Sequence, residues 1–145
     1  MSDPEPMDVP AVLDSLNVAL RLQYRSALQY LVLAGGGRGT QALAIGEQLW
    51  EYAQLEFADT RLLVSKVVAL GGTPEIRVAD VTYEASVEDG LRHLITVEEE
   101  ALAALHQVIP DTGQEPGSEA LEHLMEHMIM RKQNQVDLLI RTADV

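Results

Sequence analysis

The sequence contains no cysteine, few cations and few aromatic residues. The lack of cysteine excludes disulfide bridges, thiolate metal ligands and a cysteine nucleophile, and it is compatible with a reducing compartment. No apolar run approaches the about 18 residues that a membrane span requires. The acidic, proline-containing start is unlike a signal peptide. These absences predict a cytoplasmic protein.

Positive charge is scarce in this chain. Ten lysine and arginine residues stand against 23 aspartate and glutamate residues, which gives a formal net charge of -13. Nucleic acids and anionic membrane surfaces repel such a protein, so we expect neither as a partner. Metal cations and a basic protein partner remain compatible with the charge. The 145 residues, 47% of them apolar, are enough for one domain with a substantial core.

Apolar residues recur at steps of three and four in four segments, which predicts four helices. The expected helices cover about residues 12–34, 41–70, 87–108 and 118–142. Glycine- and proline-rich stretches separate them. Residues 1–10 contain three prolines and three acidic residues, so we expect a flexible acidic arm there and a single bundle domain over 11–145.

The connection between the second and third expected helices is long and poor in helical pattern. Residues 71–86 can reach roughly 50 Å when extended, which exceeds the approximately 45 Å rise of the second helix. This segment could therefore cross the whole bundle. Two antiparallel hairpins joined by one long crossover make an all-α four-helix bundle.

Four polar residues interrupt the apolar seams, one on each helix: Gln23, Glu56, Glu98 and Arg131. In an antiparallel hairpin, two residues equally far from the turn lie at the same height. The midpoint between the first two falls in the first glycine-rich loop, and the midpoint between the last two falls in the loop near residue 114. We therefore expect one polar layer across the bundle, joined one helical turn further on by Asp59 and Asn134.

In order, spacing and local sequence, residues 16–139 resemble the ferritin-like superfamily, most closely its bacterioferritin branch. The resemblance depends on Gln23, on Gln29-Tyr30, on Glu56-Phe57-Ala58-Asp59 and on the stretch from Leu70 to Pro74. It implies a ferritin-like four-helix bundle. Members of this superfamily carry one Glu on each of two helices and Glu-x-x-His on each of the other two, all directed at two iron ions.

The resemblance also implies a role for each polar residue, and here the chain departs from the family pattern. Glu56 and Glu98 match two carboxylate positions, whereas Gln23 replaces a third. Asp59 and Asn134 stand at the two histidine positions, and Arg131 stands at the last glutamate. If the fourth helix is shifted by one residue, Lys132 and Gln135 replace Arg131 and Asn134. In either register a cation occupies a carboxylate position.

A second departure concerns haem. Phe57 stands where bacterioferritins carry the methionine that ligates haem, and phenylalanine has no ligating atom. The resemblance therefore implies neither a complete iron site nor a haem site in this chain.

An arginine beside several carboxylates can supply the charge that a metal would otherwise provide. The first hypothesis is therefore a ferritin-like protein with a degenerate di-iron site, in which Arg131 replaces metal charge. Such a protein has no cofactor and acts as a structural or interaction protein in a homo-oligomer of at least two chains.

Two alternatives remain open. A divergent relative could bind iron or another divalent metal through Glu56, Asp59 and Glu98, and oxidise or sequester iron. Ferroxidase activity would follow from the resemblance, although the ligand set is incomplete. In the other alternative, an apolar helix face bearing Trp50 binds an unidentified protein partner.

Overall fold

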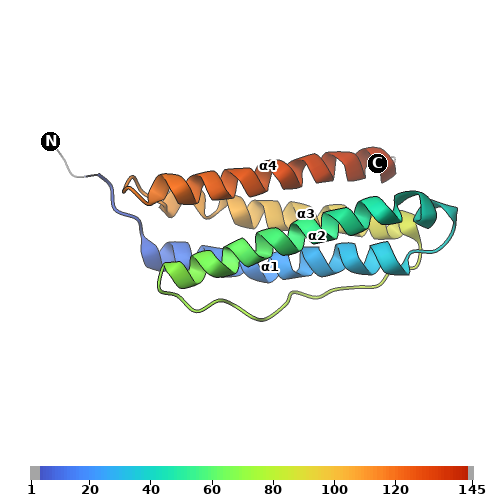
Figure 1. The fold of residues 1–145 in the computed structure, drawn as a ribbon, viewed down its shortest axis with the longest axis horizontal. Coiled ribbons are helices and arrows are strands. Elements are labelled where there is room, and N and C mark those ends of the chain that lie inside the picture. Colours follow the sequence, from blue (N-terminus) through green and yellow to red (C-terminus); the bar gives the residue numbers. More distant parts are fainter. Residues whose placement is uncertain (1–3, 144–145) are drawn as a thin grey trace.

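The computed structural model describes residues 4–143 and contains four long α-helices (Figure 1). They are α1 (Val9–Gly36), α2 (Thr40–Ala69), α3 (Val87–His106) and α4 (Ser118–Ala143), and a short 3₁₀ helix, η1 (Ile109–Asp111), precedes the last of them. The predicted all-α four-helix bundle is confirmed.

The first helix begins earlier than the sequence pattern indicated. The Asp8 carboxylate accepts a hydrogen bond from the Ala11 N–H at 3.1 Å, and Pro10 is tolerated because it lies in the first turn. Two residues assigned to the flexible arm, Val9 and Pro10, therefore belong to α1. The segment just before them is hydrogen-bonded to the loop between α3 and α4, because the Gln114 N–H donates to the Glu5 carbonyl at 2.7 Å. Residues 1–3 of the expected arm lie outside the described residues.

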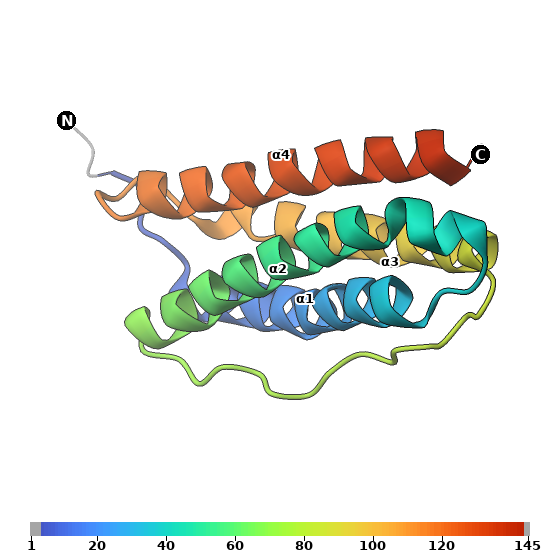
Figure 2. The same ribbon diagram turned by 45° about the vertical axis from the view of Figure 1, so that its right-hand side comes forward.

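The crossover between α2 and α3, residues 70–86, runs along the outside of α1 for nearly the whole length of the bundle (Figures 1 and 2). This is the extended connection that the sequence predicted. Side chains of α1 anchor it: the Tyr24 hydroxyl donates to the Glu75 carbonyl at 2.8 Å, and Gln29 Nε2 donates to the Thr82 carbonyl at 2.7 Å. These bonds provide partners for backbone carbonyls of an extended segment that has no neighbouring strand to pair with.

The core consists of two apolar clusters at opposite ends of the bundle. The first is built around Leu16, Leu63, Leu105 and Met125, and the second around Leu49, Leu94 and Leu139. Of the polar residues predicted from the sequence, Gln23, Glu56, Asp59 and Glu98 are buried between these clusters. Burial of the two clusters therefore positions the polar layer at mid-height in the bundle.

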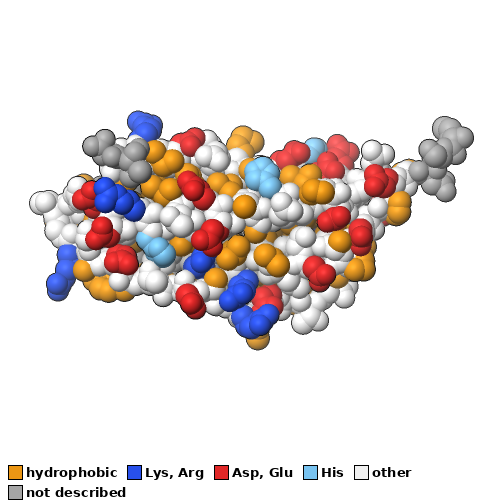
Figure 3. Space-filling view, turned by 180° about the vertical axis from the view of Figure 1, so that it is seen from behind, with side chains coloured by type: hydrophobic (Ala, Val, Ile, Leu, Met, Phe, Trp, Pro, Cys, Tyr) orange, Lys and Arg blue, Asp and Glu red, His pale blue; other side chains and the backbone are white. Residues whose placement is uncertain are grey.

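The surface reflects the composition. Acidic side chains are scattered over the face shown in Figure 3, interspersed with apolar side chains. Within residues 4–143, no helix is both long enough and apolar enough to cross a membrane.

Candidate functional site

The layer is centred on a buried lysine between two buried glutamates. Lys132 of α4, Glu56 of α2 and Glu98 of α3 are each 0% exposed. The Lys132 ammonium nitrogen lies 2.7 Å from Glu56 Oε2 and 2.8 Å from Glu98 Oε1. Three helices thus bring one cation and two anions together, away from solvent.

The fourth helix adopts the shifted register. Its inward positions are Leu121, Met125, Met128, Lys132, Gln135 and Leu139, all of them buried, at steps of four and three. Asn134 lies on the exposed face, so its expected place in the layer is wrong. From the sequence both registers of this helix were open, with Arg131 and Asn134 named first, and the structure selects the second alternative. The paired carboxylates of Glu56 and Glu98 offset the cost of burying the Lys132 ammonium.

Arg131 lies at the edge of the layer rather than at its centre. Its Nε donates to Asp59 Oδ2 at 2.6 Å, and one of its terminal nitrogens lies 3.5 Å from Glu56 Oε2. The side chain keeps 15% of its surface exposed. The Asp59 carboxylate, whose side chain is 9% exposed, is thus ion-paired with the Arg131 guanidinium. Lys132, and not Arg131, holds the central position.

Neutral side chains complete the network around Glu56. Gln23 Nε2 donates to Glu56 Oε2, and Gln135 Nε2 donates to Glu56 Oε1 at 3.1 Å. Gln135 Nε2 also lies 3.0 Å from the Tyr30 hydroxyl, which donates to Glu98 Oε2 at 3.1 Å. The buried Gln23 Oε1 has no hydrogen-bond partner among the described residues.

From the sequence, Tyr30 could neighbour the polar layer, but a tyrosine at a bundle seam is more often a packing or interface residue, so it is not among the layer residues expected there. The spacing in the sequence indicates its position, because Tyr30 follows Gln23 by seven residues and so lies on the same face of α1, two turns further along. A tyrosine in an apolar seam is usually read as core filling, which hides a hydrogen-bonding role.

The two glutamates differ sharply in proton affinity. Burial, together with the negative charge of Glu56, raises the pKa of Glu98 to about 7. Burial would also raise the pKa of Glu56, but the nearby charges of Lys132 and Arg131 outweigh it and lower that pKa to about 2. One carboxyl therefore stays ionised, while the other exchanges a proton near neutral pH.

The donors of the layer keep their protons. Burial would lower the pKa of Lys132, but the charges of Glu56 and Glu98 outweigh this effect and raise it, so the side chain remains an ammonium. Burial and the charge of Glu98 raise the pKa of Tyr30 well above its ordinary value of 10.0. Tyr30 therefore stays a hydrogen-bond donor.

This donor set does not fit a di-iron centre. An ammonium has no lone pair to offer a metal, and its charge repels an incoming cation. It also engages one oxygen of each glutamate, while Arg131 engages Asp59. Over residues 4–143, no group of three or more His, Asp or Glu side chains is arranged to hold a metal ion.

Comparisons with known proteins agree with the fold. The family model described as a ferritin-like domain matches residues 13–140. A ferritin-like diiron-carboxylate protein from Bacillus anthracis str. Ames has a TM-score of 0.83 at 21% identity, covering 99% of this chain and 99% of that chain. The bacterioferritin-related dodecameric thioferritin of Bacteroides fragilis has a TM-score of 0.81 at 18% identity, covering 94% of this chain and 86% of that chain.

A further solved structure shares the fold. The Rhodobacter capsulatus bacterioferritin, described with a metal-free dinuclear site and a haem iron, has a TM-score of 0.73 at 20% identity, covering 88% of this chain and 80% of that chain. No curated protein matches the sequence. The match over residues 13–140 spans most of the chain and confirms the resemblance noted from the sequence. This chain belongs to the ferritin-like family, and its structural neighbours are bacterioferritin-like and diiron-carboxylate proteins.

Proposed function

We propose that this chain is a ferritin-like protein in which the Lys132 ammonium takes the place of metal charge, so that the bundle does not oxidise iron. The observation that carries the proposal is the buried contact of Lys132 Nζ with both Glu56 and Glu98. A metal-free pair of buried carboxylates would be strongly destabilising through mutual repulsion. The ammonium relieves that repulsion permanently.

Arg131 has a supporting role in this proposal. It neutralises Asp59 at the edge of the layer and lies near Glu56. The sequence hypothesis assigned the replacement of metal charge to Arg131, with Lys132 in that place if the fourth helix is shifted by one residue. We now divide this role between the two cations, with Lys132 at the centre.

The biological role that we infer is structural: a homo-oligomer that presents its helices to other chains. One neighbour in fold is described as a dodecamer, and a core whose buried carboxylates are paired with cations of the protein suits a scaffold. The cytoplasmic location expected from the sequence remains a prediction.

The competing function is metal binding through Glu56, Asp59 and Glu98. The feature in its favour is that three carboxylates lie in one layer. Against it, each of the three is already engaged by a cation of the protein itself. The two functions therefore predict different effects of removing the Lys132 cation on metal binding.

The discriminating experiment is calorimetric titration of Mn²⁺ or anaerobic Fe²⁺ into three proteins: wild type, Lys132→Ala and Arg92→Ala. Arg92 is the matched control, because it pairs with Glu88 on the exposed surface of α3. We expect no saturable binding by wild type or the control. Lys132→Ala frees the two glutamates and should acquire saturable binding. Saturable binding by wild type that Lys132→Ala leaves unchanged would favour the metal-binding function instead.

A further inference from the structure

A pocket lies between α2, α3 and α4 at the end of the bundle where α2 begins. Its volume is about 210 Å³, and it is lined by Ala44, Ile45, Gln48, Leu49, Tyr52, Leu91, Leu138, Leu139 and Thr142. Three of these side chains, Leu49, Leu91 and Leu139, are buried core residues. The pocket lies about one helical turn from Gln135 but shares no residue with the polar layer. It is therefore a separate feature of the bundle.

The spacing of the helices accounts for this pocket. α2 packs closely against α1, and α3 packs against α4, whereas α2 and α4 have few close contacts. At mid-height the long side chain of Arg131 spans the space between α4 and α2, where it pairs with Asp59. Nearer the end, Ala44 of α2 and Thr142 of α4 line the space instead. Their short side chains do not fill the same width.

The lining combines apolar surface with one spare hydrogen-bond donor. Tyr52 is the only tyrosine whose hydroxyl donates to no oxygen within residues 4–143; the other three tyrosines each donate to one. Burial and the charge of Glu51 raise the pKa of Tyr52 above its ordinary value of 10.0, so the phenol keeps its proton. The Thr142 hydroxyl, by contrast, donates to the Leu138 carbonyl of its own helix at 2.8 Å.

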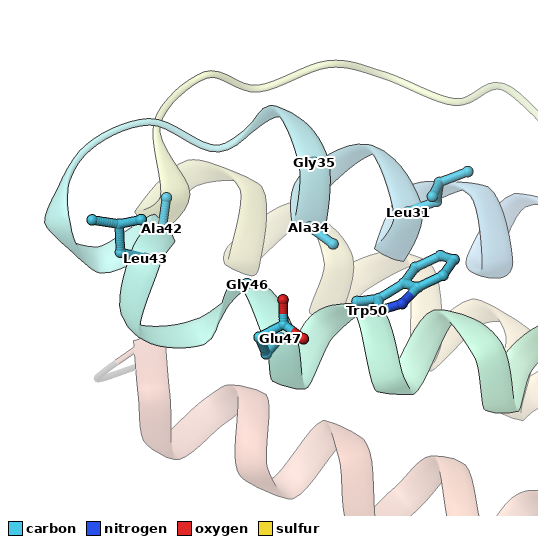
Figure 4. Close-up of a pocket in the computed structure, with 8 residues that line it drawn as sticks. All are labelled: Leu31, Ala34, Gly35, Ala42, Leu43, Gly46, Glu47 and Trp50. Carbon is cyan, nitrogen blue, oxygen red and sulfur yellow. The ribbon is translucent and has the colours of Figure 1, made fainter.

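A larger pocket between α1 and α2 provides a comparison. It has a volume of about 320 Å³ and is lined by Leu31, Ala34, Gly35, Ala42, Leu43, Gly46, Glu47 and Trp50 (Figure 4). This pocket is more open to solvent, and its lining includes the Glu47 carboxylate. An apolar ligand there would remove water from a charged group, which is costly. The pocket between α2, α3 and α4 has no charged lining residue, so it suits an uncharged apolar ligand better.

From these observations we propose that the pocket between α2, α3 and α4 binds a small neutral molecule with one apolar ring and one oxygen that accepts a hydrogen bond from Tyr52. Small-molecule sites combine an apolar lining with a few polar groups in this way. An apolar cavity of about 150 Å³ already holds benzene, so the volume of about 210 Å³ admits a substituted ring. The site needs neither a metal nor a second chain, and it goes beyond the proposed function.

The first test locates the site with two probes, acetophenone and ethylbenzene, titrated into the full chain and followed by ligand-observed NMR. Ala44→Phe should weaken the binding of both probes at least ~10-fold, because the added ring occupies the pocket. Leu43→Phe is the matched control: it adds the same side chain at the neighbouring residue, which lines the other pocket. Consecutive helical residues point about 100° apart, so this control should change neither affinity by more than about 2-fold.

The second test isolates the hydrogen bond. The two probes share a ring and differ in that acetophenone carries a carbonyl oxygen. Tyr52→Phe should weaken acetophenone about 3- to 10-fold, the loss expected for one hydrogen bond, and should leave ethylbenzene within about 2-fold. Tyr83→Phe on the crossover is the control and should change neither affinity. Both probes should also raise the melting temperature of wild type and of Leu43→Phe, but not that of Ala44→Phe.

Several outcomes would overturn the proposal. The first is a wild-type chain that binds neither probe saturably up to the solubility limit of each. Unchanged binding in Ala44→Phe would also contradict it, and a loss confined to Leu43→Phe would place the site in the pocket of Figure 4. Equal effects of Tyr52→Phe on the two probes would contradict the assigned hydrogen bond. None of these readouts depends on metal content, so failure here is distinct from failure of the proposed function.

Discussion

Arg131 and Lys132 are consecutive residues of α4, yet both approach the same oxygen of Glu56. The Lys132 nitrogen lies 2.7 Å and the nearer Arg131 nitrogen 3.5 Å from Glu56 Oε2. Neighbouring helical residues point about 100° apart, so Lys132 reaches this oxygen from the core and Arg131 from the edge. A single carboxylate thus links the buried ion pairs with the partly exposed pair between Arg131 and Asp59.

Removing the central cation should destabilise the fold strongly. We expect Lys132→Met to lower the free energy of unfolding by about 3 to 5 kcal/mol, because two buried carboxylates lose their partner. Urea denaturation followed by circular dichroism measures the change. Arg92→Met is the control and should cost less than about 1 kcal/mol, since its pair with Glu88 is exposed.

A neutral version of the layer should recover that loss. Combining Lys132→Met with Glu56→Gln and Glu98→Gln removes the buried charges together, and stability should return to within about 1 to 2 kcal/mol of wild type. If Lys132→Met alone proves as stable as wild type, the ammonium does not hold the layer together.

Stability should depend on pH through Glu98. Its pKa rises from 4.5 to about 7 on folding, so the folded state holds a proton that the unfolded state has released. The resulting stabilisation is complete below pH 4.5 and is lost as the pH rises through 7. We expect the free energy of unfolding to fall between about pH 4.5 and 7.5, and Glu98→Gln to flatten this slope.

Glu56 should make the free energy of unfolding rise with pH, and it should do so below the pH range in which Glu98 acts. Its pKa falls from 4.5 to about 2 on folding, so its contribution is present above pH 4.5 and is lost as the pH falls toward 2. Urea denaturation at a series of pH values should therefore show a maximum near pH 4.5. A free energy of unfolding that rises steadily from pH 4.5 to 8 would contradict the Glu98 assignment, and one that does not fall between pH 4.5 and 2 would contradict the Glu56 assignment.

The Tyr30 hydroxyl should contribute measurably to the stability of the fold. Tyr30→Phe leaves Glu98 Oε2 without its donor, and we expect a loss of about 1 to 3 kcal/mol in the free energy of unfolding. Tyr52→Phe is a matched control, because Tyr52 packs edge-on against Tyr30 but its hydroxyl forms no hydrogen bond within residues 4–143. Equal losses of unfolding free energy in the two variants would show that the hydrogen bond from the Tyr30 hydroxyl to Glu98 does not stabilise the fold.

The sequence was sufficient to predict the bundle and the level of its polar layer. Helical periodicity located four helices, and the symmetry of Gln23 with Glu56 about the first loop placed both at one height. The rotation of α4 was harder, because two neighbouring faces contain apolar residues: Leu124 and Leu138 on one, Met125 and Leu139 on the other. Packing against α3 decides between them, and that information is not local.

The identity of the central cation depends on the same rotation. A one-residue shift exchanges Arg131 for Lys132 and Asn134 for Gln135. Burying a lysine is costly in isolation, so a rule based on single residues favours the wrong face. That cost is offset by Glu56 and Glu98, which converge on the ammonium from two other helices.

The most direct test of the central claim is elemental analysis of the wild-type protein purified from cells grown in iron-rich medium, followed by oxygen-uptake measurements on adding Fe(II). If the Lys132 ammonium replaces metal charge, the protein should contain far less than one transition-metal ion per chain and should not accelerate oxygen uptake. About two iron ions per chain, as in di-iron bundles, together with rapid oxygen uptake, would contradict the claim.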